Sequence, residues 1–146
     1  MTYNKPLAAY KETRIRTASQ GQLIVMLYDE AVKQLENCLE LLQANKTGKN
    51  DPSKIEIIGN ALIKTREIIT ELTVSLNLDE GGEIAQNLFA LYTWFNKELL
   101  ESHMTMDIAR ITAVKDQVSS LRSAWVEIAA KTNTENPQVE GLNIAG

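Results

Sequence analysis

The sequence predicts an all-α protein: an antiparallel up-down four-helix bundle with an N-terminal arm and a flexible C-terminal tail. Apolar residues recur every three or four positions over four stretches of roughly 20 to 25 residues, the spacing of helices with one buried face. The breaks between these stretches are short, which favours antiparallel neighbours. No stretch shows the strict polar–apolar alternation of a half-exposed strand.

The composition is that of one ordinary globular domain. The chain has 146 residues, is 44% hydrophobic and carries a formal net charge of −4, which indicates no general affinity for nucleic acid or an anionic membrane. The longest apolar run, residues 23 to 28, is too short to cross a bilayer, and the N-terminus lacks the apolar segment of a secretory signal. We therefore expect a cytoplasmic protein.

The first 18 residues form the predicted arm. They are locally basic, show no sustained helical period, and contain the spaced apolar residues Leu7, Tyr10 and Ile15. Two interpretations stay open: an arm that is free in solution, or an arm that docks on the body. We favour docking slightly, because these apolar side chains would otherwise lie in water.

The first predicted helix covers residues 19 to 42. Ser19 and Gln22 form an S-x-x-Q capping box, the start signal of a helix. Tyr28 and Asp29 are expected to be a structural pair, with Asp29 bonded to a neighbouring helix or loop. The single cysteine excludes an internal disulfide and should act as a small core side chain. The apolar stripe consists of Leu23, Ile24, Leu27, Tyr28, Ala31, Val32, Leu35, Cys38, Leu39 and Leu42.

The second predicted helix follows a break at residues 45 to 53. Asp51 should cap it, Pro52 suits its first position, and it should end near Leu76. Its periodic residues are Ile55, Ile58, Leu62, Ile63, Thr65, Ile69, Leu72, Thr73 and Leu76.

The third and fourth predicted helices follow the Gly81–Gly82 break and Asp107. Asn87 is expected to form a hydrogen bond inside the bundle. The bundle should end at residue 131, leaving residues 132 to 146 as the tail. The buried faces are predicted to contain Ile84, Leu88, Leu91, Tyr92, Phe95 and Leu99 in the third helix, and Ile108, Ile111, Val114, Val118, Leu121, Trp125 and Ile128 in the fourth.

The sequence contains no recognisable catalytic or metal-binding pattern. Its one histidine, His103, does not stand three residues after a glutamate, as the di-metal motif of helical bundles requires. Cysteine pairs and a glycine-rich phosphate loop are also lacking. We expect no enzyme activity, no cofactor and no metal, and we interpret His103 as a residue of a helix–helix turn.

Several apolar residues lie beside the predicted buried faces. One interpretation is a wide core with a few exposed apolar residues. The other is an apolar groove that receives amphipathic helices of a partner. Periodicity does not distinguish the two. The residues concerned are Val25, Met26, Leu41, Phe89, Trp94 and Val126.

Three sequence blocks resemble the flagellar secretion chaperones, small helical proteins that bind flagellin before export. The blocks are TASQGQLIVMLYDEAV at residues 17 to 32, GGEIAQNLFALYTW at 81 to 94 and LRSAWVEI at 121 to 128, in the family's order. Two positions depart from the family pattern. Gln20 replaces its usual proline, and Glu30 replaces a glycine that could permit close approach of another backbone.

The resemblance implies an antiparallel four-helix bundle and a partner. Such a chaperone captures the disordered C-terminal amphipathic region of flagellin in the cytoplasm. It prevents premature polymerisation and keeps flagellin competent for flagellar type III secretion. Flagellar regulatory or export-gate proteins are possible further partners. The alternative function is a helical structural or regulatory module that binds another partner helix.

The resemblance also suggests a binding site. Within the family the N-terminal segment can occupy part of the partner groove, so the expected plug consists of Leu7, Tyr10 and Ile15. The expected groove residues are Leu23, Met26, Leu27, Leu88, Leu91, Tyr92, Leu121 and Trp125.

Overall fold

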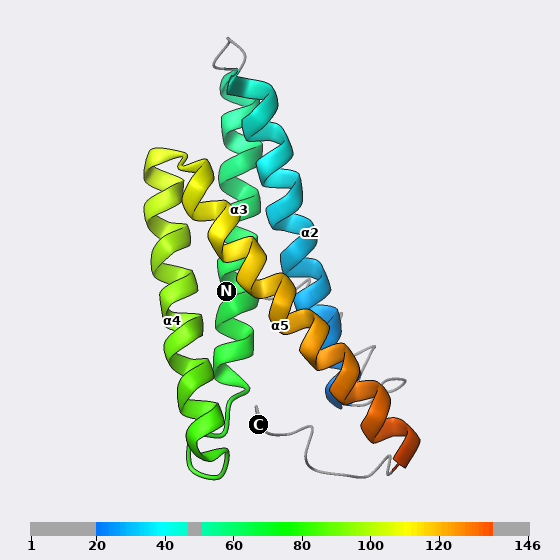
Figure 1. Ribbon diagram of the computed structural model, residues 1–146. Helices are drawn as coiled ribbons and strands as arrows, with labels where there is room; N and C mark the ends of the chain where they lie inside the picture. The colour runs from blue at the N-terminus through cyan, green and yellow to red at the C-terminus, as the bar shows by residue number, and fades with distance from the viewer. Residues whose placement is uncertain (1–19, 47–50, 136–146) are drawn as a thin grey trace.

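The computed structural model describes residues 20–46 and 51–135, which form four α-helices (Figure 1). These are α2 (Gln20–Lys46), α3 (Pro52–Val74), α4 (Gly82–Thr105) and α5 (Ile108–Glu135). No strand occurs within these two ranges, so the described part of the chain confirms the predicted all-α class. The predicted arm and Ser19 of the capping box lie outside the described residues.

The helix ends follow the local signals in the sequence. Asp51 caps α3 by accepting a hydrogen bond from the backbone N–H of Ser53, with Pro52 at the first helical position. Gly82 begins α4 with a φ of 62°, a conformation that glycine adopts without a steric penalty. The carboxylate of Asp107 accepts from the backbone N–H of Arg110 and caps α5. Helix α5 continues to Glu135, beyond the predicted boundary at residue 131.

Each helix packs against two others. Helix α2 contacts α3 and α5, and α4 also contacts α3 and α5, so α2 and α4 lie diagonally opposite. Figure 1 shows consecutive helices running in opposite directions. The start of α5 lies beside the end of α4, whereas its second half runs along α2 and away from α4 (Figure 1).

The core contains a hydrogen bond between two buried tyrosines from the diagonal helices. The hydroxyl oxygens of Tyr28 in α2 and Tyr92 in α4 lie 2.5 Å apart, and both side chains are fully buried. Burial raises the pKa of both phenols, that of Tyr92 to about 12. Since a buried polar group needs a partner, each hydroxyl satisfies the other.

The surroundings of Cys38 and His103 indicate that both residues have a structural role. Cys38 is fully buried among apolar side chains, as expected, and burial raises the pKa of its thiol to about 12. His103 lies in the last turn of α4, against Gly59 of α3. A Cβ added at Gly59 would lie 2.8 Å from the Nε2 atom of His103, so the glycine makes room for the imidazole.

Five residues predicted to be buried are exposed instead. Successive helical residues point about 100° apart, so residues at the margin of an apolar stripe are covered only where a neighbouring helix reaches them. Ile63, for example, follows the buried Leu62 by one position and faces outward. The five corrected residues are Ile55, Ile63, Ile84, Asn87 and Ile128.

Replacing either core tyrosine by phenylalanine should show how much the tyrosine pair contributes to the stability of the fold. Tyr28→Phe or Tyr92→Phe should each lower the free energy of unfolding by about 1–3 kcal/mol, because the remaining buried hydroxyl loses the hydrogen bond to the other tyrosine. Tyr28 keeps a side-chain hydrogen bond with Trp125 in Tyr92→Phe, so the loss there should be the smaller one. The double variant should be more stable than the sum of the two losses predicts. Urea denaturation of the four proteins measures this; strictly additive losses would contradict the pairing.

Candidate partner-binding face

One side of α4 carries exposed apolar residues near the start of the helix. Ile84, Asn87, Leu91 and Trp94 follow one another at spacings of three, four and three, so they lie on one face. Ile84 and Trp94 are 54% and 39% exposed, Asn87 is exposed and Leu91 is half-buried. The same spacing continues to Glu98 and Glu101 near the end of the helix.

Helix α5 carries a corresponding face. One side of α5 begins at Arg110 and continues in alternating steps of four and three residues. The first residue reached is the buried Val114, and the next four residues are partly or fully exposed. Leu121 is half-buried, and the other three are exposed. These four residues are Gln117, Leu121, Ala124 and Ile128.

The two faces are directed toward each other, as the ion pairs of Arg110 demonstrate. Arg110 of α5 contacts the carboxylates of Glu98, at 3.6 Å, and Glu101, both on α4. Asp107, in the turn between the helices, lies 3.7 Å from the same guanidinium. Hydrogen bonding to Glu101 and the charges of all three carboxylates raise the pKa of Arg110. The ends of the two faces are therefore held together at this turn.

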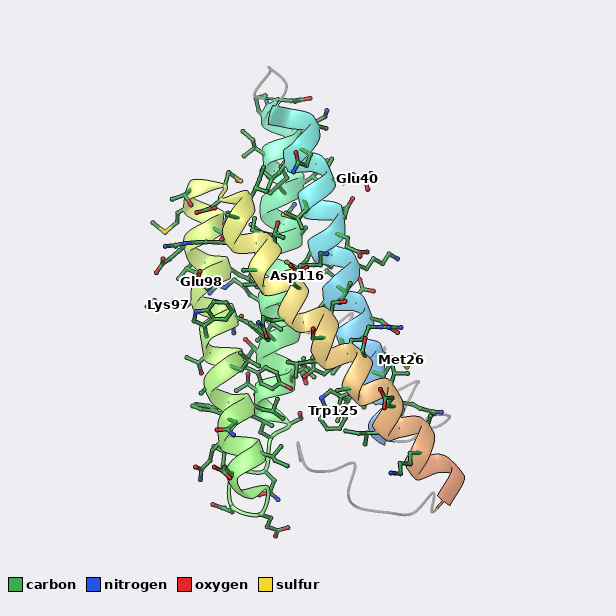
Figure 2. The ribbon with its side chains drawn as sticks, viewed as in Figure 1. Met26, Glu40, Lys97, Glu98, Asp116 and Trp125 are labelled. Carbon is green, nitrogen blue, oxygen red and sulfur yellow. The ribbon has the colours of Figure 1, made fainter. Side chains whose placement is uncertain are left out.

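Away from this turn the two faces separate. Figure 2 shows Glu98 on the half of α4 beside which α5 begins, and Trp125 on the other half of α5, where the helices have diverged. The ion pair between Arg122 and Asp29 ties this half of α5 to α2 instead. We call the surface left uncovered the α4–α5 face; it consists of Ile84, Asn87, Leu91, Trp94, Gln117, Leu121, Ala124 and Ile128.

Aromatic side chains form the base of the α4–α5 face. Tyr92 and Trp125 are buried beneath it. The rings of Trp94 and Phe95 pack in a tilted arrangement with centroids 5.8 Å apart, and those of Tyr92 and Phe95 are 6.3 Å apart. These contacts link the exposed Trp94 to the core. None of the eight residues of the face carries a charge, so the surface suits an apolar or amphipathic segment.

The structure brings together five of the eight predicted groove residues. Leu91 and Leu121 belong to the α4–α5 face itself, at equal numbers of residues from Met106 in the intervening turn. The other three are buried below or beside it and contribute to the core. These three are Leu88, Tyr92 and Trp125.

The three predicted groove residues of α2 are not part of this face. Leu27 is a core residue, and Leu23 is buried outside the contiguous core. Met26 is half-buried and projects away from Trp125, to the other side of α5 (Figure 2). The predicted plug residues Leu7, Tyr10 and Ile15 lie outside the described residues.

The prediction missed six residues of the α4–α5 face as groove residues. The sequence predicts Ile84 and Ile128 on buried faces and Asn87 in a hydrogen bond inside the bundle, and it places Trp94 only among the apolar residues beside these faces. No pattern in the sequence identifies Gln117 and Ala124 as groove residues. A usable signal was present in the charges: Arg110 and the acidic pair Glu98 and Glu101 identify which sides of the two helices face each other.

Other functional features can be assessed only within residues 20–46 and 51–135. No helix there is sufficiently long and apolar to span a membrane. No group of three or more histidine, cysteine, aspartate or glutamate side chains in that part is arranged to hold a metal ion.

Asp29 and Glu30 belong to the first of the three blocks that resemble the chaperone family, residues 17 to 32. Asp29 bonds the neighbouring helix α5 through Arg122, as expected. Glu30 accepts a hydrogen bond of 2.8 Å from the Nε2 atom of Gln34, one turn later in α2. Glu30 therefore supports its own helix at the position where a glycine was expected.

Comparison with known proteins gives a consistent family match. The family model described as flagellar protein FliS matches residues 3–132. The flagellar secretion chaperone FliS of Salmonella typhimurium is 34% identical over 124 residues, which cover 84% of this chain and 85% of the relative. The Escherichia coli protein of the same name is 32% identical over 117 residues, 80% of each chain. That of Bacillus subtilis is 29% identical over 126 residues, 86% of each chain.

The two tryptophans should differ in their access to solvent. A variant with Trp125→Phe retains only Trp94, which is 39% exposed, and a variant with Trp94→Phe retains only Trp125, which is 4% exposed. In chains that lack residues 2–15, and with them the expected plug, acrylamide should quench the fluorescence of Trp94 several-fold more strongly than that of Trp125. Quenching of both variants in concentrated guanidinium chloride is the control. Equal protection of both indoles in the folded proteins would mean that the α4–α5 face is covered.

Proposed function

Because the chain belongs to the FliS family of flagellar proteins, we propose that it is a flagellin-binding export chaperone. It captures the disordered C-terminal amphipathic region of flagellin in the cytoplasm, prevents premature polymerisation and keeps flagellin competent for flagellar type III secretion. The observation that carries the proposal is the uncharged, partly apolar α4–α5 face, with Ile84 and Trp94 exposed on one side and Ile128 on the other.

Binding would remove this face and the apolar side of a partner helix from water. Burial of apolar surface contributes roughly 25 cal/mol per Å². The partner loses conformational freedom on ordering, which offsets roughly 2–5 kcal/mol or more of that gain. The exposed amides of Asn87 and Gln117 can pair with polar groups of the partner. The action is one of binding and release, with no chemical step.

The scaffold for this function is an antiparallel up-down bundle with a docking arm and a flexible tail. The arm supplies the plug, Leu7, Tyr10 and Ile15, which occupies the partner site until flagellin displaces it. Of the predicted groove residues, Leu91 and Leu121 then contact the partner directly, and Leu88, Tyr92 and Trp125 support them from below. Flagellar regulatory or export-gate proteins are further partners of the same chaperone.

Substitution on the α4–α5 face should weaken flagellin binding. Ile84→Asp should reduce the affinity for a peptide of the last ~40 residues of flagellin, the length of about two helices, by tenfold or more. Burial of an isoleucine contributes about 1.5–3 kcal/mol, and a buried carboxylate adds a penalty. Isothermal titration calorimetry measures the affinity, and a negative heat-capacity change should accompany binding.

The matched control for Ile84→Asp is Ile57→Asp. Ile57 is 48% exposed, similar to Ile84, but it lies near the start of α3, at the opposite end of the bundle from the start of α4, where Ile84 lies (Figure 1). The control variant should bind within about twofold of the unsubstituted chain, as a surface substitution away from the interface does. Equal loss in both variants would place the binding site elsewhere. Absence of binding by the unsubstituted, folded chain would remove the flagellin proposal and favour a helical module for another partner.

Removal of the plug should strengthen flagellin binding. Deletion of residues 2–15 frees the site, so the competing intramolecular interaction no longer lowers the apparent affinity. We expect a smaller apparent Kd or, at least, faster association in stopped-flow measurements. Replacing Leu7, Tyr10 and Ile15 together by serine in the full-length chain should have the same effect. A clear loss of affinity would mean that the arm forms part of the binding site.

A further inference from the structure

Helix α5 is attached to two different helices by its two arginines. Near its start, Arg110 pairs with Glu98 and Glu101 of α4. Further along, Arg122 pairs with Asp29 of α2. Arg110 lies at the closed end of the α4–α5 face, and Arg122 lies among the residues of α5 that have moved away from α4.

Helix α5 packs more extensively on α2 than on α4, so apolar packing already favours the observed side. The buried residues Val118 and Trp125 hold α5 in the core, but the hydrophobic effect is not directional. Movement of the second half of α5 toward α4 would bring Leu121 and Ile128 against Leu91 and Ile84, removing apolar surface of both helices from water. The packing of α5 on α2 opposes this movement, and a specific contact between α5 and α2 opposes it further.

We propose that the Asp29–Arg122 ion pair keeps the α4–α5 face open, while Arg110 holds the closed end of the face at fixed width. Asp29, Arg110 and Arg122 are then positioning residues, which act through the placement of α5 and do not contact the partner. Loss of the Asp29–Arg122 pair lets α5 approach α4 and hides the face; loss of the Arg110 contacts lets the closed end widen. The consequence for binding rests on the proposed function, whereas the helix positions can be measured without a partner.

The direct test is the distance between α4 and α5 in solution. Ala90 and Glu127 are exposed, lie outside the α4–α5 face, and can be replaced by cysteine to carry spin labels. Cys38 should remain unlabelled, because it is buried and burial raises its pKa to about 12. Labelling of the chain without the two new cysteines checks this. Pulsed electron paramagnetic resonance then gives the distance distribution.

Variants of the two attachments should move α5 in opposite directions. Arg122→Gln and Asp29→Asn should each shorten the mean label distance by about 1–2 Å or more, the scale of helix shifts within packed bundles. Arg110→Gln should lengthen or broaden it. Exchange of the two charges in the variant Asp29→Arg with Arg122→Asp should restore the original distribution.

The matched control is Lys115→Gln. It removes one positive charge from α5, as Arg122→Gln does, but the ion-pair partner of Lys115 is Asp116 on the same helix, at 3.2 Å. This variant should leave the distance unchanged. The proposal is overturned if Arg122→Gln and Asp29→Asn give the same distance as Lys115→Gln, or if the charge exchange fails to restore the distribution.

Binding supplies the second readout. Arg122→Gln should lower the affinity for the C-terminal flagellin peptide by about twofold to fivefold, the range of one exposed ion pair, and the charge exchange should restore it. Unchanged affinity despite a shortened distance would overturn the link between α5 position and binding. If the unsubstituted chain does not bind the peptide, the flagellin proposal fails, while the distance measurements still decide whether the ion pairs position α5.

Discussion

The hydrogen bond between Tyr28 and Tyr92 joins two helices that have little other contact with each other. Helices α2 and α4 lie diagonally across the bundle, and each packs mainly on α3 and α5. A buried phenol without a partner is unfavourable by about 1–3 kcal/mol, so the pairing of the two hydroxyls favours the rotation of α2 and α4 that brings them together. In this rotation Leu88 lies in the core and Leu91 lies at the margin of the core.

The rotation of α4 explains why an apolar helix is left partly uncovered. The first half of α4 carries large apolar side chains on several sides, including Ile84, Phe89 and Trp94. A helix of this kind is usually surrounded by protein. Here α3 covers one side and the core another, but α5 diverges before it reaches the side with Ile84. An uncovered apolar surface that is anchored to the core through aromatic contacts is typical of a site for a partner.

The closed and open ends of the α4–α5 face have different physical origins. At the closed end, Asp107 caps α5, and the left-handed conformation of Met106, with a φ of 55°, turns the chain between the two helices. The carboxylates near this turn hold Arg110 in place. At the open end, α5 follows α2. In the proposed function the partner must be released, and a face whose width is set in part by exposed ion pairs is easily adjusted, because such pairs are weak individually.

The sequence by itself determined the four helices, the signals at their ends and most of the core. These signals act locally, so they can be recognised without knowledge of neighbouring elements. They are the helical period, Asp51 with Pro52, the Gly81–Gly82 pair and Asp107. The three family blocks also identified the class of protein, because they are patterns of residue identity that can be recognised without the structure. Tertiary structure alone decided which margin residues are covered: Ile84 and Ile128 are exposed because α4 and α5 diverge, and Asn87 faces the same opening. The path of α5 depends on contacts with two helices distant in sequence, and helical period carries no information about such contacts.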